Sequence, residues 1–283
     1  MNSQTTETPT QVIFISGSTR GLGRVLARDL ACERSVTVFH GRALPDAERS
    51  VDQFRSEFPS YKALGFAADY SKLSEVCCLA QSLSHLQLTM IVNNAASINP
   101  RNPAWTNDGF PYSYQVNFLA HWLLMELLLP QLVESGATVI NIVSKTMSRM
   151  NLSEVRTIIP EKEAYARAKF GLLIMLRWIS LQYPNLKTLA IHPSSLLNTG
   201  MTRDAERSPR SSVQKVSRQI ADYLRAADDV PNCSYIEFGH RLVSPVPVDN
   251  DEALVVEVAL STRSLLEPWL AEGLGKGYSH SNL

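Results

Sequence analysis

The fold is decided by the stretch Val12-Ile13-Phe14-Ile15-Ser16-Gly17-Ser18-Thr19-Arg20-Gly21-Leu22-Gly23. Its first four residues form an apolar, β-branched run that is typical of a buried strand in a parallel sheet. Apolar residues then recur at a helical spacing, at Val25, Leu26 and Leu30. The glycines allow a tight turn, let a pyrophosphate approach the main chain, and pack helix on strand. Because the helix N-terminus adds free N–H groups, the stretch predicts dinucleotide binding rather than a simple turn.

The end of the second strand indicates which dinucleotide binds. Val36-Thr37-Val38-Phe39 leads into His40-Gly41-Arg42, and no acidic residue follows before Asp46. An acidic side chain at this point binds a free ribose hydroxyl, whereas an arginine accommodates a 2′-phosphate. Arg42 and Arg20 together offer two guanidinium groups suited to a phosphate monoester. We therefore expect NADP(H) rather than NAD(H), the alternative being two solvated surface arginines.

Further apolar runs predict strands near residues 63–66, 88–92, 139–143 and 189–191, with helical patterns between them. This alternation predicts an α/β fold with one doubly wound, mostly parallel sheet and helices on both faces. We place a single domain at residues 11–272, between a disordered tail at 1–10 and a flexible tail at 273–283.

Small or polar residues follow these strands, at the edge where open α/β sheets bind ligands. Asp69 and Tyr70 follow the third strand, Asn94-Ala95-Ala96 the fourth, Ser144 the fifth and Pro193 the sixth. We expect the alanines to leave room for a cofactor while the asparagines, Asn94 among them, hold neighbouring strand ends together. The position of Asp69 just after a strand end also allows contact with the adenine of a cofactor. Asp69 and the asparagines fit a purely structural turn as well.

Tyr165 and Lys169 lie in segment 161–182, whose apolar spacing predicts a helix. Positions four apart share a helix face, so the phenol and the ammonium group meet. A cation beside a phenol lowers the tyrosine pKa, as a general acid or base requires. Such pairs also occur on solvated helix faces. Asn117, among apolar neighbours before a long helix, is an amide that needs hydrogen-bond partners.

The composition argues against several other classes of function. With 27 basic and 27 acidic residues the net charge is zero, which gives no electrostatic case for nucleic acid or an anionic membrane. The four cysteines show neither metal-ligand spacing nor a disulfide framework, so we expect no metal. Residues 1–10 are polar, unlike a signal peptide. The apolar run 118–133 is interrupted by charged and proline residues, so we interpret it as a buried helix in a cytoplasmic protein without a membrane partner.

Six features occur in the order and approximate spacing of one family: Gly17/Gly21/Gly23, Asn93-Asn94-Ala95, Asn117, Ser144, Tyr165 and Lys169. Residues 11–200 thus resemble the short-chain dehydrogenase/reductase family, which implies a Rossmann-type domain and hydride transfer with a nicotinamide cofactor. The resemblance implies that Tyr165 donates a proton to a substrate carbonyl and that Ser144 hydrogen-bonds its oxygen. It also implies that Lys169 binds the nicotinamide ribose and that Asn117 holds a water linking the lysine to solvent. Our cofactor-binding set comprises Gly17, Ser18, Thr19, Arg20, Gly21, Leu22, Gly23, Arg42, Asp69, Tyr70, Asn94, Ala95, Ala96, Tyr165, Lys169, Pro193 and Thr199.

Asp108-Gly109-Phe110 and the tail 241–269 look like the retinol dehydrogenase and protochlorophyllide reductase-like branch, which implies a hydrophobic substrate. Three departures from the family pattern stand out. The segment between Ser144 and Tyr165 is longer than usual, which implies an insertion beside the substrate site. Pro193-Ser194 stands where the family has Pro-Gly, and an extra residue leaves open whether Asn198 or Thr199 contacts the nicotinamide.

Residues 198–230 fit either a substrate lid or a solvated loop with a surface helix, whose apolar face is Val216, Ile220 and Leu224. A strand candidate follows at 234–238 and a last helix at about 251–270, packed through Leu254, Val255, Val258 and Leu266.

The sequence therefore predicts an NADPH-dependent enzyme that reduces a ketone or aldehyde of a small hydrophobic molecule, reversibly. Two alternatives stay open: an enzyme that reduces a C=C bond or epimerises its substrate with the same tyrosine, and a cofactor-binding regulatory protein without turnover. The apolar helices around Leu123 and Leu172 fit either a core or the face of a homodimer or homotetramer.

Overall fold

The computed structural model describes residues 11–98, 104–149, 155–194, 197, 211–225, 230–238, 242–245, 248 and 251–274. Within them one sheet has the strand order β3-β2-β1-β4-β5-β6-β7-β8, in which β1 to β7 run parallel and β8 pairs antiparallel with β7. The order reverses between β1 and β4, which confirms the predicted doubly wound, mostly parallel sheet. The strands are β1 (Gln11–Ile15), β2 (Ser35–Gly41), β3 (Lys62–Ala67), β4 (Met90–Asn93), β5 (Thr138–Ile142), β6 (Lys187–His192), β7 (Ser234–Glu237) and β8 (Leu242–Pro245).

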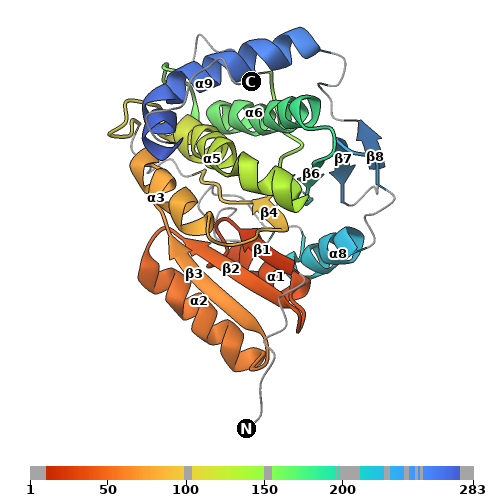
Figure 1. Cartoon of the computed structure of the whole chain (residues 1–283). Coiled ribbons are helices and arrows are strands. Elements are labelled where there is room, and N and C mark those ends of the chain that lie inside the picture. The colour runs from red at the N-terminus through yellow and green to blue at the C-terminus, as the bar shows by residue number, and fades with distance from the viewer. Residues whose placement is uncertain are drawn as a thin grey trace.

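Helices cover both faces of the sheet, as Figure 1 shows. One hydrophobic cluster joins the sheet to α1 (Gly21–Leu30), α2 (Leu44–Glu57) and α8 (Val213–Arg225). A second cluster joins the opposite face to α3 (Leu73–Leu83), α5 (Ala120–Ser135), α6 (Glu161–Gln182) and α9 (Glu252–Leu274). The short α4 (Tyr112–Tyr114) and a π-helical turn, η1 (Gln115–Leu119), lead directly into α5. Every strand of the parallel part thus ends at the same edge, where the candidate residues gather.

The predicted elements agree with the structure except towards the C-terminus. Helix α6 has the predicted bounds, and β7 lies within the predicted strand. Helix α9 runs four residues beyond its predicted end, into the segment 273–283 that the sequence predicts to be a flexible tail. Strand β8 was not predicted. Its Pro245 has no backbone N–H, which is tolerated because β8 lies at the edge of the sheet. Residues 198–210 and 226–229 of the predicted lid, and the tails 1–10 and 275–283, lie outside the described residues.

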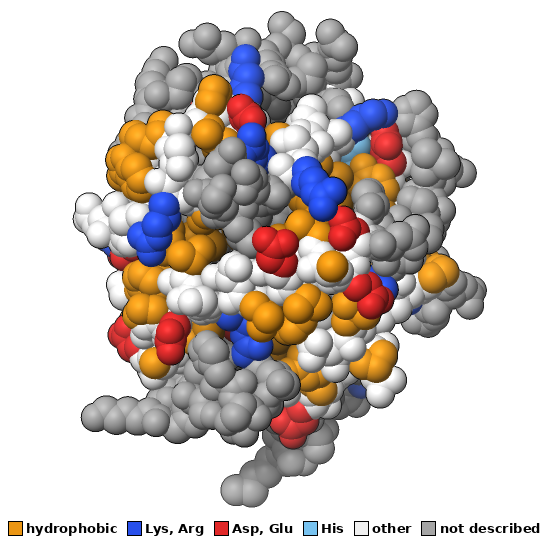
Figure 2. Space-filling view, turned by 90° about the horizontal axis from the view of Figure 1, so that it is seen from above, with side chains coloured by type: hydrophobic (Ala, Val, Ile, Leu, Met, Phe, Trp, Pro, Cys, Tyr) orange, Lys and Arg blue, Asp and Glu red, His pale blue; other side chains and the backbone are white. Residues whose placement is uncertain are grey.

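The apolar stretch Tyr112–Ser135 passes the length and hydropathy test for a membrane span, with a mean hydropathy of 1.4, and 78% of that window is buried inside the fold. Helix α9 packs against α3, α5 and α6, and lies across α5 and α6 in Figure 1. Leu123 on α5 and Leu172 on α6 are fully buried. These side chains therefore belong to the core of this chain. Figure 2 looks onto the α9 side, where hydrophobic side chains alternate with charges of both signs.

Candidate active site

Two glycines bring the loop after β1 against the loop after β4. Gly17 has φ +64°, in the left-handed region, and a Cβ there would lie 2.8 Å from the Cα of Ala95. A Cβ on Gly23 would lie 2.5 Å from both the Asn94 side-chain nitrogen and the Gly17 carbonyl oxygen. Real Cβ atoms do not approach other atoms so closely. Only glycine therefore allows this contact, which leaves the N-terminus of α1 facing the edge of the sheet.

Ser16 and Asn94 hold this junction with hydrogen bonds. Ser16 Oγ accepts from the backbone N–H groups of Asn94 and Ala95, both at 2.9 Å. The Asn94 amide donates to the carbonyls of Ser16 (2.8 Å) and Gly17 (3.2 Å). The Asn93 side-chain nitrogen donates to Asn141 Oδ1 at 2.8 Å, which ties β4 to β5. Both asparagines thus hold neighbouring elements together, as the sequence predicts, whereas the part played by Ser16 was missed.

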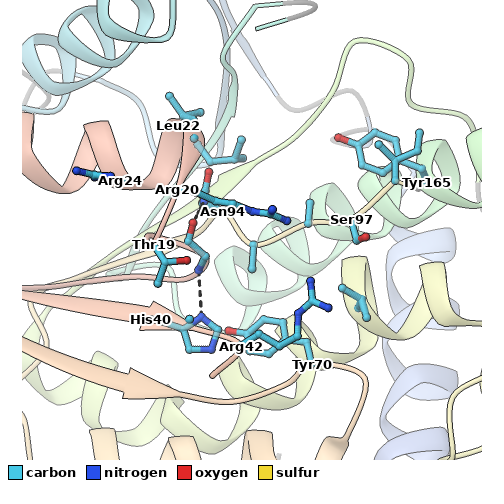
Figure 3. A pocket seen from close by; sticks show the side chains of 18 of the residues that line it. Thr19, Arg20, Leu22, Arg24, His40, Arg42, Tyr70, Asn94, Ser97 and Tyr165 are labelled. Carbon is cyan, nitrogen blue, oxygen red and sulfur yellow. Dashed lines mark hydrogen bonds between the residues drawn. The ribbon is translucent and has the colours of Figure 1, made fainter. Parts of the chain in front are cut away.

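His40, at the end of β2, fixes the glycine loop from the other side. The Gly17 N–H donates to His40 Nδ1 at 3.0 Å, the bond dashed in Figure 3, and His40 Nε2 lies 3.2 Å from the Ala68 carbonyl. Burial lowers the pKa of His40 to about 4, so the ring is neutral and Nε2 carries its proton. Ser18 Oγ donates to the Ile15 carbonyl at 2.7 Å and accepts from the His40 N–H at 2.9 Å. Ser18 therefore stabilises the loop from inside and does not line the cavity.

A cavity of about 1000 Å³ runs along the carboxyl edge of the sheet, past the glycine loop to α6. Ser18, Gly23 and Asn117 lie behind its wall, and Thr199 and Asn198 lie outside the described residues. The predicted site residues that line the cavity are Gly17, Thr19, Arg20, Gly21, Leu22, Arg42, Asp69, Tyr70, Asn94, Ala95, Ala96, Ser144, Tyr165, Lys169 and Pro193. A cavity of this size, closed at one end by glycines and a helix N-terminus, fits a dinucleotide and a small substrate.

The end of the cavity beside α1 and β2 is rich in arginine. Arg20 precedes α1 and Arg42 follows β2; both are exposed, and their guanidinium groups point into the cavity in Figure 3. Arg24 and Arg49 also line it, and Arg49 is paired with Asp46. This end therefore presents a net positive surface to a ligand, as an extra phosphate requires.

Asp69 lines the same end of the cavity and also has a turn role. Its Oδ1 accepts from the Ser71 N–H (3.0 Å) and the Ser71 hydroxyl (2.8 Å), as the structural alternative predicts. Contact with adenine stays a prediction for this residue.

Tyr165 and Lys169 stand together at the N-terminal half of α6. Lys169 is 1% exposed, its Nζ donates to the Ile142 carbonyl at 2.9 Å, and it lies 5.7 Å from the centroid of the Tyr165 ring. Burial lowers the pKa of Lys169 to about 7, and within the described residues no carboxylate forms an ion pair with it. Tyr165 is half-buried and its hydroxyl points into the cavity in Figure 3. The pair thus places a readily deprotonated lysine beside a phenol in contact with the cavity.

Ser144, two residues beyond the end of β5, lines the cavity near this pair. Its Oγ lies 3.0 Å from the Thr146 hydroxyl and accepts from the Thr146 N–H at 3.3 Å. The Thr146 N–H fixes the serine oxygen, and either hydroxyl can be the donor in the contact between Ser144 and Thr146.

Asn117 is fully buried in η1, and both ends of its amide bind protein groups. Its Oδ1 accepts from the Ser97 N–H, and its Nδ2 donates to the Ser97 carbonyl, both at 2.8 Å, and to Ser113 Oγ at 3.0 Å. Asn117 therefore positions Ser97, which lines the cavity. The π-helical turn that carries it is a form often found at functional sites. Its water-holding role stays a prediction.

The family model for short chain dehydrogenases matches residues 11–210. The chain belongs to the short chain dehydrogenase family. It is therefore an oxidoreductase of a family that uses nicotinamide cofactors.

Two curated relatives and one solved structure illustrate the likeness. Retinol dehydrogenase 13 from Mus musculus is 24% identical over 96% of this chain and 88% of its own length. Polyprenol dehydrogenase from Mus musculus is 38% identical over 46% of this chain, and the match spans only 39% of that protein. An alcohol dehydrogenase from the archaeon Thermococcus sibiricus, complexed with 5-hydroxy-NADP, covers 83% of this chain and 96% of its own, with a TM-score of 0.64 and 18% identity. The last of these shows the fold alone.

Several residues that line the cavity of this short chain dehydrogenase were not predicted from its sequence. His40 is the last residue but one of β2, and His192 is the last residue of β6. Neither histidine has a sequence spacing that marks it as part of a site. Ser194, which stands where the family has glycine, has φ +94°, so the backbone keeps the conformation that favours glycine. The other cavity residues outside our predicted set include Ser97, Ile98, Tyr112, Val116, Val143, Thr146 and Leu197.

Proposed function

We propose that this chain is an NADP(H)-dependent oxidoreductase that interconverts a carbonyl and an alcohol. The observation that carries the proposal is the buried Lys169 beside Tyr165, at the wall of a cavity whose other end is closed by the glycine loop. A lysine with a pKa of about 7 is matched to proton transfer at neutral pH.

The residues present fit a nicotinamide dinucleotide. The glycines at 17 and 23 let the loop after β1 pack against Asn94 and Ala95. The first turn of α1, where Gly21 and Leu22 line the cavity, directs free N–H groups towards it. Arg20 and Arg42 would hold a 2′-phosphate, and β2 ends without an acidic residue that would repel it. Lys169 would bind a ribose hydroxyl with the ammonium protons that Ile142 does not use. When bound, the cofactor supplies or accepts the hydride.

The protein side of the reaction is proton transfer and stabilisation of charge. Tyr165 would donate its phenol proton to the carbonyl oxygen as that oxygen gains negative charge. Ser144, fixed by the Thr146 N–H, would donate a second hydrogen bond to the same oxygen. The charge of Lys169 lowers the cost of the transient phenolate, and its own proton can replace the one that leaves Tyr165.

A hydrophobic carbonyl compound is the substrate class that the cavity supports best. The apolar residues that line the cavity include Ile98, Val116, Val143 and Leu197. The curated relatives are named for retinol and polyprenol, both of them hydrophobic alcohols. Burial of such a ligand is favourable by roughly 25 cal/mol per Å² of apolar surface.

The proposal is tested by NADPH oxidation with long-chain aldehydes, ketones and quinones, and by identification of each product. The expected product is the alcohol, formed with NADPH in preference to NADH. A saturated carbonyl product would show reduction of a C=C bond instead. Tight NADPH binding with no product from any compound would favour a regulatory protein.

A further inference from the structure

Thr146 places a second hydroxyl at the cavity wall beside that of Ser144. It follows Ser144 by two residues and lines the same cavity. Its hydroxyl oxygen lies 3.0 Å from Ser144 Oγ, and its backbone N–H donates to that same oxygen at 3.3 Å. Both polar hydrogens of Thr146 are therefore within hydrogen-bonding reach of one serine oxygen.

The backbone on both sides of Thr146 is tied to other elements of the fold. Lys145 Nζ donates to Glu237 Oε1 on β7 at 2.9 Å. The Ser148 N–H donates to the Ala166 carbonyl on α6, the helix that carries the candidate proton donor, at 3.4 Å. The position of Thr146 next to the serine oxygen therefore does not depend on the contact between the two hydroxyls alone.

The hydrogen-bonding capacity of the two hydroxyls determines which of them donates when a ligand is bound. Each hydroxyl has one proton to donate and can accept two hydrogen bonds. In the free protein either Ser144 or Thr146 can be the donor. A carbonyl oxygen only accepts, so Ser144 must use its single proton to bind it. The contact between the two hydroxyls then remains a hydrogen bond only if Thr146 donates to Ser144.

We propose that Thr146 is a positioning residue, whose hydroxyl donates to Ser144 Oγ while Ser144 donates to the substrate carbonyl. This inference rests on the proposed function, which places that carbonyl at Ser144 and Tyr165. As the carbonyl oxygen gains negative charge, it draws the Ser144 proton closer and makes Ser144 Oγ a better acceptor. The bond from Thr146 then strengthens as well, because hydrogen bonds in a chain polarise one another. Thr146 would thus stabilise the transition state more than the bound carbonyl, and its removal would lower kcat rather than raise KM.

The test compares Thr146→Val, which keeps the shape of the side chain without its hydroxyl, with Thr146→Ser, which keeps the hydroxyl. Thr146→Val is also combined with Ser144→Ala, and Ser148→Ala, at an exposed residue that does not line the cavity, is the control. The rate of NADPH oxidation is followed with a carbonyl compound that the wild type reduces, at enzyme concentrations that make the residual turnover of Ser144→Ala measurable. The Kd of NADPH and the midpoint of thermal unfolding are measured for each variant without turnover.

Thr146→Val is expected to lower kcat about threefold to tenfold, with the KM of the carbonyl compound, the Kd of NADPH and the unfolding midpoint unchanged. Thr146→Ser and Ser148→Ala should both stay close to the wild-type rate. In the Ser144→Ala background Thr146→Val should cause no further loss, because the threonine hydroxyl acts through the serine.

Three results would overturn the proposal while the proposed function stands. The first is a kcat of Thr146→Val within about twofold of the wild type, and the second is an equal loss in Thr146→Ser, which would show that shape and not the hydroxyl matters. The third is a further loss in the Ser144→Ala background, which would mean a direct bond to the substrate or a displaced loop. A wild type that reduces no carbonyl compound would refute the proposed function itself, which separates the two failures.

Discussion

The clearest structural prediction concerns Gly23→Ala. The added Cβ would lie 2.5 Å from both the Asn94 side-chain nitrogen and the Gly17 carbonyl oxygen, and one of these is backbone. Relief of the clash must separate Asn94 from the carbonyls of Ser16 and Gly17, to which it donates at 2.8 and 3.2 Å. Overpacking of this kind costs about 1–3 kcal/mol. The lost hydrogen bonds add about 1 kcal/mol, and the helix preference for alanine returns a similar amount.

The lost hydrogen bonds and the helix preference for alanine cancel, so Gly23→Ala is expected to lower the free energy of unfolding by about 1–3 kcal/mol. In a domain of this size the midpoint of thermal unfolding should fall by about 2–4 °C per kcal/mol. Movement of the loop should also remove a backbone hydrogen bond to the pyrophosphate and weaken NADPH binding about tenfold or more.

Gly109→Ala is the matched control for this variant. Gly109 has φ +79°, a Cβ there would meet nothing within 4 Å, and the residue does not line the cavity. It should lose about 1–2 kcal/mol through backbone strain, with NADPH affinity unchanged. The two variants are compared by differential scanning calorimetry and by NADPH titration. If Gly23→Ala binds NADPH within twofold of the wild type, the glycine loop does not hold the phosphates and the reasoning is refuted.

Three further predictions follow from the same site. Arg42→Ala should raise the Kd for NADPH about 10- to 100-fold, because a charge-assisted bond to the 2′-phosphate is lost, and should leave the Kd for NADH within twofold; equal losses for both would contradict the 2′-phosphate assignment. The pKa of His40 is about 4 in the folded protein, against 6.5 in the unfolded chain. As the pH falls from 6.5 to 4, only the unfolded state therefore takes up a proton at His40. The protein loses about 3 kcal/mol of unfolding free energy over that range. In urea unfolding the stability difference between wild type and His40→Leu should therefore narrow as pH falls, and a constant difference would argue against a neutral, buried ring. Ser194→Gly should relieve the strain at φ +94° and raise the unfolding midpoint; a lower midpoint would mean that the Ser194–Ser211 hydrogen bond outweighs the strain.

Local patterns were enough to predict the fold and the two ends of the site. The β-branched run before Gly17 and the helical spacing after it are short-range signals, and so is the separation of Tyr165 and Lys169 on α6. Such signals can be detected in a single sequence, because each depends only on residues within one helical turn or one strand. Short-range patterns of the same kind predicted each of the parallel strands β1 to β7.

Contacts between distant residues could not be predicted in this way. His40 accepts from an N–H that is 23 residues away, and Asn117 binds Ser97 across 20 residues, so no spacing rule marks either bond. The left-handed backbone at Ser194 was equally hidden, because serine rarely adopts it. Strand β8 is four residues long and includes a proline, which made it resemble a turn.

The most direct test of the account is turnover by Tyr165→Phe. The phenol is the one proton donor that the account places at the substrate carbonyl, and the phenylalanine ring preserves the packing of α6 against the cavity. Purified wild type and variant are compared for the rate of NADPH oxidation with a reducible carbonyl compound and for the Kd of NADPH. The account predicts a loss of about 100-fold or more in kcat with the Kd of NADPH within a few-fold of the wild type. A variant that reduces the carbonyl at close to the wild-type rate would contradict the account.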